Sequence, residues 1–149
     1  MNGSADANSP PCAAAAPLPR RLNILLVEDS ENDALLIADA LRRGGFAVSW
    51  TRVDSAAELR AALARPPWHA ILSDWKLPGF SAGDAFAICR EAAPGVPFVI
   101  VSGFADDRSM AHAASQGMRL WVSKDRLERL AGLLTGLGIG AGATTAGAA

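Results

Sequence analysis

The sequence predicts an α/β fold in which one parallel sheet carries helices on both of its faces. Three observations lead to this fold class. Short apolar runs alternate with segments of helical periodicity, five times along the chain. Proline and glycine pairs separate several of these segments. The apolar runs are also nearly continuous, which is typical of parallel strands that are buried on both faces.

The strands are expected at the apolar runs, which are bounded by turn-forming residues or by helical patterns. They occupy residues 22–27, 47–51, 69–73, 97–101 and, as a weaker run, 120–122.

The helices are expected where apolar residues repeat with helical spacing. Ser30 followed by Asp33 begins the first helix as a capping box, and Gly44-Gly45 ends it. Ser55 and Glu58 begin the second helix in the same way, and a proline pair closes it. Three further helices are predicted at residues 84–93, 106–116 and 125–134.

The order of strand and helix restricts the topology. Right-handed crossovers place a helix over the sheet after each strand, which gives a flavodoxin-like, doubly wound, five-stranded parallel sheet with helices on both faces. In such folds ligands bind beyond the carboxyl ends of the strands.

Composition divides the chain of 149 residues into three parts. Residues 1–19 are rich in Ala, Pro, Ser and Asn and are predicted to be a flexible leader. Residues 136–149 are mostly Gly, Ala and Thr and are predicted to be a flexible tail. One ordered domain is therefore expected at residues 20–135.

Charge and hydropathy argue against several classes of partner. The net charge is −1, and no run of Lys and Arg is long enough to bind along a phosphate backbone or an anionic membrane surface. We therefore expect neither nucleic acid nor membrane as a partner. No signal peptide is evident and no apolar stretch approaches the roughly 20 residues that span a bilayer. The two cysteines, Cys12 and Cys89, suit a reducing compartment. We therefore expect a cytoplasmic location.

Acidic residues follow two of the strands that should end at the ligand-binding edge. Glu28 and Asp29 come directly after the first strand, and Asp74 comes directly after the third. Three carboxylates in one crevice would repel one another unless a hard cation lay among them, and Mg2+ prefers oxygen ligands. The sequence therefore predicts a Mg2+ site.

A nucleophile and its supporting groups are predicted at the same edge. Asp74 can attack phosphorus, Lys124 supplies positive charge for the phosphoryl oxygens, and the Ser102 hydroxyl can donate to one of them. Each residue alone is more simply explained as a solvated side chain, and an acidic pair after a strand as a helix-start charge. The prediction depends on all of them meeting at one edge.

These segments resemble the receiver domain of bacterial response regulators, over residues 22–134. The resemblance rests on residues 24–30, 73–79, 99–103 and 123–125. It implies that Asp29 and Asp74 ligate Mg2+ directly, that Glu28 acts through water, and that the Lys76 backbone carbonyl is a further ligand. It also implies that Ser102 is the switch hydroxyl and Trp121 the switch aromatic residue.

The sequence departs from the family pattern at two places near this site. Trp121 stands where Tyr or Phe is usual, and Asp125 follows Lys124 where proline is frequent. The segment from Lys124 onward resembles receivers that occur alone or attached to sensor kinases.

The function expected from this resemblance is that of a stand-alone phosphorelay receiver rather than an enzyme with turnover. Asp74 would accept a phosphoryl group from a sensor histidine kinase or a histidine phosphotransfer protein, with at most self-catalysed phosphorylation and dephosphorylation. The signal would then pass to an unknown downstream protein through a changed contact surface, and homodimerisation stays open.

Two alternatives remain. A Mg2+-dependent phosphohydrolase generally has an acid two residues after its nucleophile, where this chain has Lys76. A receiver that signals without phosphorylation is the other alternative.

Overall fold

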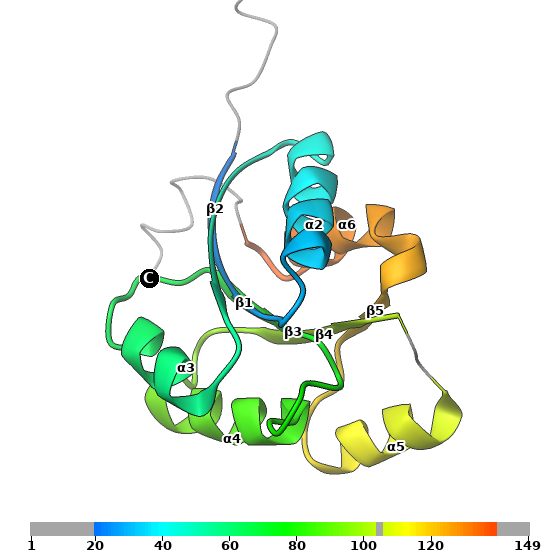
Figure 1. The fold of residues 1–149 in the computed structure, drawn as a ribbon. Coiled ribbons are helices and arrows are strands. Elements are labelled where there is room, and N and C mark those ends of the chain that lie inside the picture. The colour runs from blue at the N-terminus through cyan, green and yellow to red at the C-terminus, as the bar shows by residue number, and fades with distance from the viewer. Residues whose placement is uncertain (1–19, 104–105, 140–149) are drawn as a thin grey trace, which may run out of the picture.

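The computed structural model describes residues 20–103 and 106–139, and in this part of the chain strands and helices alternate (Figure 1). The predicted leader, residues 1–19, and residues 140–149 of the predicted tail lie outside the described residues. In chain order the elements are β1 (Arg20–Val27), α2 (Glu31–Arg43), β2 (Phe46–Val53), α3 (Ala56–Leu63), β3 (Ala70–Ser73), α4 (Ala82–Ala92), β4 (Phe98–Ser102), α5 (Asp107–Ser115), β5 (Trp121–Ser123), the 3-10 turn η1 (Lys124–Arg126) and α6 (Glu128–Gly136).

The five strands form one sheet in the order β2-β1-β3-β4-β5, and every neighbouring pair is parallel. The register aligns the carboxyl ends of the strands. Val27 of β1 lies opposite both Val53 of β2 and Ser73 of β3, and Ser102 of β4 lies opposite Ser123 of β5. The predicted doubly wound parallel sheet is confirmed, and the residues that follow its strands emerge at one edge.

Helices cover both faces of the sheet. Helices α2 and α6 lie on one face, and α3, α4 and α5 lie on the other (Figure 1). Each face has its own apolar core. The first contains Ile37, Leu41 and Leu130, and the second contains Leu59 and Ile88. Burial of these side chains on both faces explains why the strand sequences are continuously apolar.

Capping residues set the helix starts. The Ser30 hydroxyl accepts a hydrogen bond from the Asp33 N–H at 3.2 Å and so begins α2 as predicted. Helix α4 begins two residues earlier than the predicted Asp84, because Ser81 and Asp84 form a reciprocal capping box. The helix predicted from Asp125 is instead the turn η1 followed by α6.

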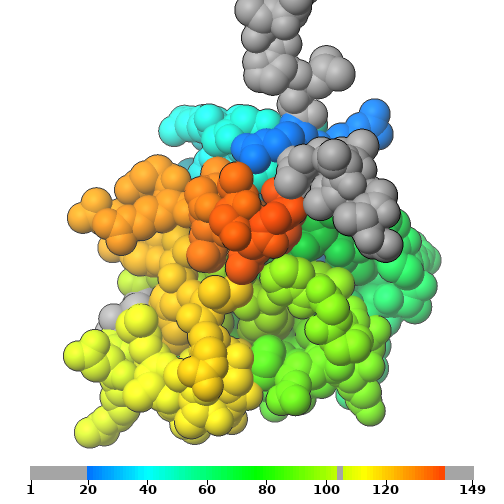
Figure 2. All heavy atoms as spheres, turned by 180° about the vertical axis from the view of Figure 1, so that it is seen from behind, coloured from blue at the N-terminus to red at the C-terminus, as the bar shows by residue number. Residues whose placement is uncertain are grey.

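The packed body continues past the predicted boundary at residue 135. Helix α6 ends at Gly136, and Ile139 is only 9% exposed and packs into the core beneath α2 and α6. Arg20 joins the two ends of this body, since its guanidinium donates to the Thr135 hydroxyl at 3.1 Å and to the Gly44 carbonyl at 3.3 Å. Figure 2 shows the reverse face, where α4, α5 and α6 form much of the surface.

Among residues 20–103 and 106–139, no helix has the length and apolarity that crossing a bilayer requires.

Candidate functional site

The candidate site lies at the carboxyl edge of the sheet, where strand pairing fixes the backbone of the acidic residues. The Glu28 N–H donates to the Val53 carbonyl at 3.0 Å, and the Asp74 N–H donates to the Val27 carbonyl at 2.9 Å. These two hydrogen bonds hold both acids next to the ends of the central strands. The edge therefore carries the predicted residues Glu28, Asp29, Asp74, Ser102 and Lys124.

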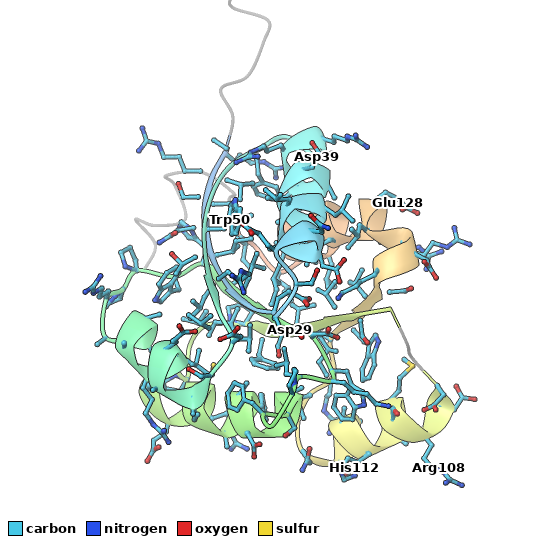
Figure 3. All side chains as sticks on the ribbon, in the orientation of Figure 1. Asp29, Asp39, Trp50, Arg108, His112 and Glu128 are labelled. Carbon is cyan, nitrogen blue, oxygen red and sulfur yellow. The ribbon has the colours of Figure 1, made fainter. Side chains whose placement is uncertain are left out.

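The three predicted metal-binding acids come together. Carboxylate oxygens of Glu28, Asp29 and Asp74 all lie within 4.8 Å of one another. Glu28 is buried at 2% exposure, whereas Asp29 is exposed at the foot of α2, as Figure 3 shows. The cluster is therefore closed on one side and open to solvent on the other.

The acidic cluster has the chemistry of a Mg2+ site. All of its ligand atoms are hard carboxylate oxygens, and its exposed side leaves room for the waters that Mg2+ usually retains. Each residue offers one carboxylate oxygen, and the three oxygens are close enough together for one small cation to lie among them. These residues fit the predicted ion.

Lys124 reaches the cluster from the end of β5, the outermost strand on one side of the sheet. Its Nζ lies 2.9 Å from Glu28 Oε1, 3.2 Å from Asp74 Oδ2 and 2.6 Å from Asp33 Oδ2. The lysine comes directly after β5, so the pairing of β5 with β4 determines its position. The ammonium group thus lies within hydrogen-bonding distance of the predicted nucleophile.

Burial and charge act on the acid–base groups of this cluster in opposite directions. Burial raises the pKa of Glu28, and the hydrogen bond from Lys124 only partly offsets this effect. Burial by itself would lower the pKa of Lys124, but hydrogen bonds to Asp33 and Glu28 and the charge of Asp74 hold that pKa above its ordinary value. Lys124 therefore carries a full positive charge at neutral pH.

Asp33 is a site residue that the sequence analysis missed. Its position in the first turn of α2 indicates a capping role, and its backbone N–H does bind the Ser30 hydroxyl of the cap. Its carboxylate instead makes the shortest of the three contacts to Lys124. No local pattern signals this contact, because the two residues are 91 positions apart.

The predicted switch residues lie on β4 and β5, the two strands that follow β3 in the sheet order, and Asp74 comes directly after β3. Ser102 ends β4 and is buried at 4% exposure. Trp121 begins β5, and its ring lies against Trp75, with centroids 5.2 Å apart. The Trp121 Nε1 is buried without a hydrogen-bond partner among the residues that the structure describes.

Trp75 links the predicted acceptor, Asp74, to its surroundings. The Trp75 backbone N–H donates to Asp74 Oδ1 at 2.7 Å, and the Trp75 ring forms a T-shaped pair with the His112 ring on α5. Lys76, the predicted carbonyl ligand, lies in the exposed loop between β3 and α4, two residues after Asp74.

Comparison with known families gives a match over most of the described chain. Residues 24–134 match the response regulator receiver domain family. Among curated proteins, none matches the sequence.

Solved structures with the same fold are receiver domains. One is a Burkholderia pseudomallei response regulator, crystallised with a phosphorylated aspartic acid, a calcium ion and citrate, at 22% identity and a TM-score of 0.59; the match covers 69% of this chain and 59% of that one.

A second is a response regulator receiver domain from Clostridium thermocellum, at 19% identity and a TM-score of 0.65; the match covers 77% of this chain and 92% of that one. A third is the receiver domain of a Syntrophus aciditrophicus histidine kinase, at 20% identity and a TM-score of 0.65; the match covers 77% of this chain and 88% of that one. At these identities the likeness shows the fold.

Proposed function

Since the chain belongs to the response regulator receiver domain family, we propose that it works in two-component signalling by accepting a phosphoryl group on Asp74. The donor is the phosphohistidine of a sensor histidine kinase or of a histidine phosphotransfer protein. The observation that carries the proposal is the position of the Lys124 ammonium group, 3.2 Å from Asp74 Oδ2 and next to the acidic cluster.

The transfer is a displacement at phosphorus. A carboxylate oxygen of Asp74 forms the new O–P bond, and the P–N bond of the donor breaks with its electron pair leaving on the imidazole. Lys124 neutralises the oxygens of the transferring group, and no separate base is needed because the nucleophile is a carboxylate. The Ser102 hydroxyl, at the end of β4, supplies a further hydrogen bond to the phosphoryl oxygens.

The residues that would hold Mg2+ are Glu28, Asp29, Asp74 and the backbone carbonyl of Lys76. When bound, the ion would offset the negative charge of the carboxylates and of the incoming phosphoryl group. The buried Glu28 carboxylate supports this assignment, because a second positive charge beside it stabilises the ionised form that burial disfavours.

The output is a changed protein-contact surface rather than a released product. Phosphorylation adds about −1.5 to −2 charge beside Ser102 and Trp121, enough to bias a surface with two arrangements. The affected region is residues 106–134, and its target is a protein rather than nucleic acid or membrane. We place this relay in the cytoplasm.

The phosphohydrolase alternative requires an acid two residues after the nucleophile, and this chain has Lys76 there. We therefore propose a signalling domain whose catalysis is limited to its own phosphorylation and dephosphorylation. The other alternative is a receiver that signals without phosphorylation. It does not explain why the Lys124 ammonium group lies so close to the Asp74 carboxylate.

The test is intact-protein mass spectrometry after incubation with acetyl phosphate and Mg2+. We expect one added phosphoryl group, none in Asp74→Asn and none when the metal is chelated. Asp84→Asn is the matched control, because it removes an acid of a helix cap that is not one of the three clustered acids and should still be phosphorylated. Phosphate release from many unrelated esters would favour the hydrolase, and an unmodified wild type would favour signalling without phosphorylation.

A further inference from the structure

Three helices of this fold have an acidic residue at the same position of the first turn, and one of the three behaves differently. In α4 the Asp84 carboxylate accepts a hydrogen bond from the Ser81 N–H at 3.2 Å. In α3 the Glu58 carboxylate accepts a hydrogen bond from the N–H of Asp54, which precedes the helix, at 3.0 Å. Both acids bind the backbone at the start of their own helix. Asp33 of α2 reaches out of its helix to Lys124 at 2.6 Å.

Glu28 takes over the capping role that Asp33 leaves. The Ser30 N–H, which an acid at this position would ordinarily bind, donates to Glu28 Oε2 at 3.1 Å. The backbone of α2 therefore needs no help from the Asp33 carboxylate. Its contact with Lys124 is an arrangement specific to this helix.

The contact with Asp33 completes the hydrogen bonding of Lys124. An ammonium group has three donors, and Glu28, Asp33 and Asp74 are its three acceptors. A phosphoryl group on Asp74 would offer new acceptor oxygens to the same group. Lys124 can then move fully onto the phosphoryl oxygens only by giving up one of its present partners.

We propose that Asp33 is a positioning residue that competes with the phosphoryl group for Lys124 and so limits the stability of the phosphorylated state. The inference rests on the proposed function, because it assumes that Asp74 is the acceptor. Asp33 keeps the ammonium group at the site while Asp74 is unmodified. It also opposes the transfer of that group to the phosphoryl oxygens, since a charge-assisted hydrogen bond must weaken first.

The experiment measures the apparent affinity for beryllofluoride, an anion that takes the place of a phosphoryl group on a carboxylate. The wild type, Asp33→Asn and Asp33→Glu are titrated with it in the presence of Mg2+, using tryptophan fluorescence. Asp33→Asn keeps the size of the side chain but replaces a charged acceptor by a neutral one. We expect beryllofluoride to bind it about threefold more tightly or better, as loss of a partly exposed ion pair implies.

Two further variants separate the competition from an effect on the helix. Asp33→Glu keeps the negative charge and should return the affinity close to that of the wild type. Asp84→Asn removes the corresponding acid of α4 and should bind beryllofluoride as the wild type does. Asp33→Ala should follow Asp33→Asn and serves if the asparagine variant is poorly folded.

The outcomes distinguish the two proposals. If the wild type accepts a phosphoryl group from acetyl phosphate but Asp33→Asn binds beryllofluoride no more tightly, Asp33 does not compete for Lys124 and only this inference fails. If the wild type is neither phosphorylated nor bound by beryllofluoride, both proposals fail. An increase in affinity that disappears in about 0.5 M salt would show a diffuse charge effect and would also overturn the competition, because a contact at this distance is screened far less.

Discussion

The rings of Trp75 and Trp121 lie against each other with their planes inclined by 45°, and they join the loop after β3 to the start of β5. Trp75 also comes directly after the proposed acceptor, and its backbone N–H donates to Asp74 Oδ1. A movement of the Asp74 carboxylate is therefore felt by a ring that contacts the predicted switch residue. This route to Trp121 does not pass through Ser102.

The first prediction follows from this position of Trp75. Addition of Mg2+ at millimolar concentration, on the order of what weak carboxylate sites need, should change the tryptophan emission of the protein. The reason is that the ion would bind the same Asp74 carboxylate that accepts the hydrogen bond from the Trp75 backbone N–H. A fluorescence titration at constant ionic strength, with Ca2+ as a second hard cation, makes the measurement.

Two variants assign this signal. Trp75→Phe should lose most of the Mg2+-dependent change in emission. Trp68→Phe should keep it, because the Trp68 indole N–H donates to the Ala62 carbonyl of α3 and not to a residue of the acidic cluster. A flat titration of the wild type would count against the metal site.

The second prediction concerns the pH dependence of stability through Glu28. Burial holds the pKa of Glu28 above its ordinary 4.5, so between pH 4.5 and the raised value the folded state keeps a proton that the unfolded state has lost. Stability contributed by this group is full below that window and falls as the pH rises through it, by at most about 1.4 kcal/mol per pH unit.

Urea unfolding of the metal-free protein at a series of pH values tests the sign. Relative to Glu28→Gln, the wild type should lose unfolding free energy as the pH rises from about 4.5 toward neutrality. Mg2+ should then stabilise the wild type more than Glu28→Gln, since it binds only the folded site. Parallel pH profiles for the two proteins would contradict the assignment.

The third prediction concerns the contact between Gly44, which follows the last residue of α2, and Ala131 of α6. A Cβ on Gly44 would collide with the Cβ of Ala131, although the φ of Gly44 is −85° and suits any residue. Gly44→Ala should therefore destabilise the protein by about 1–3 kcal/mol through overpacking, measured by urea unfolding.

Two controls isolate the collision. Ala131→Gly in the Gly44→Ala background should restore much of the lost stability, because it removes the clashing methyl group. Gly132→Ala lies in the same helix, with no atom within 4 Å of the added Cβ, and should instead stabilise by roughly 0.5–1 kcal/mol. Equal losses from Gly44→Ala with and without Ala131→Gly would show that the two helices do not meet there.

Most of the fold could be predicted because its signals are local. The continuous apolar runs predict all five strands. Ser30 predicts the start of the first helix, because its hydroxyl binds the N–H of Asp33, only three residues along the chain. The predicted start of α4, Asp84, lies two residues after the observed start, because the N-cap is Ser81 and Asp84 is the third residue of the helix. The last helix was predicted as continuous from Asp125, but the Ser123 hydroxyl caps the separate turn η1.

The site was predictable only in part. Glu28, Asp29 and Asp74 could be grouped because each directly follows a strand, and parallel strands end at a common edge. Asp33 could not be found in this way, since in sequence it is an ordinary first-turn acid. The contact of Trp75 with Trp121 was likewise invisible, because it depends on where a loop crosses the sheet edge.

The sequence by itself determined the order of strands and helices, the sheet edge at which the candidate site lies and the family to which the chain belongs. These depend on side-chain periodicity and on hydrogen bonds between near neighbours, which the chain carries in every local segment. Only the tertiary structure decided which acids share Lys124 and which ring meets Trp121. Those choices arise when residues distant in the chain compete for a few donors and a small volume, and such competition exists only after the sheet has formed.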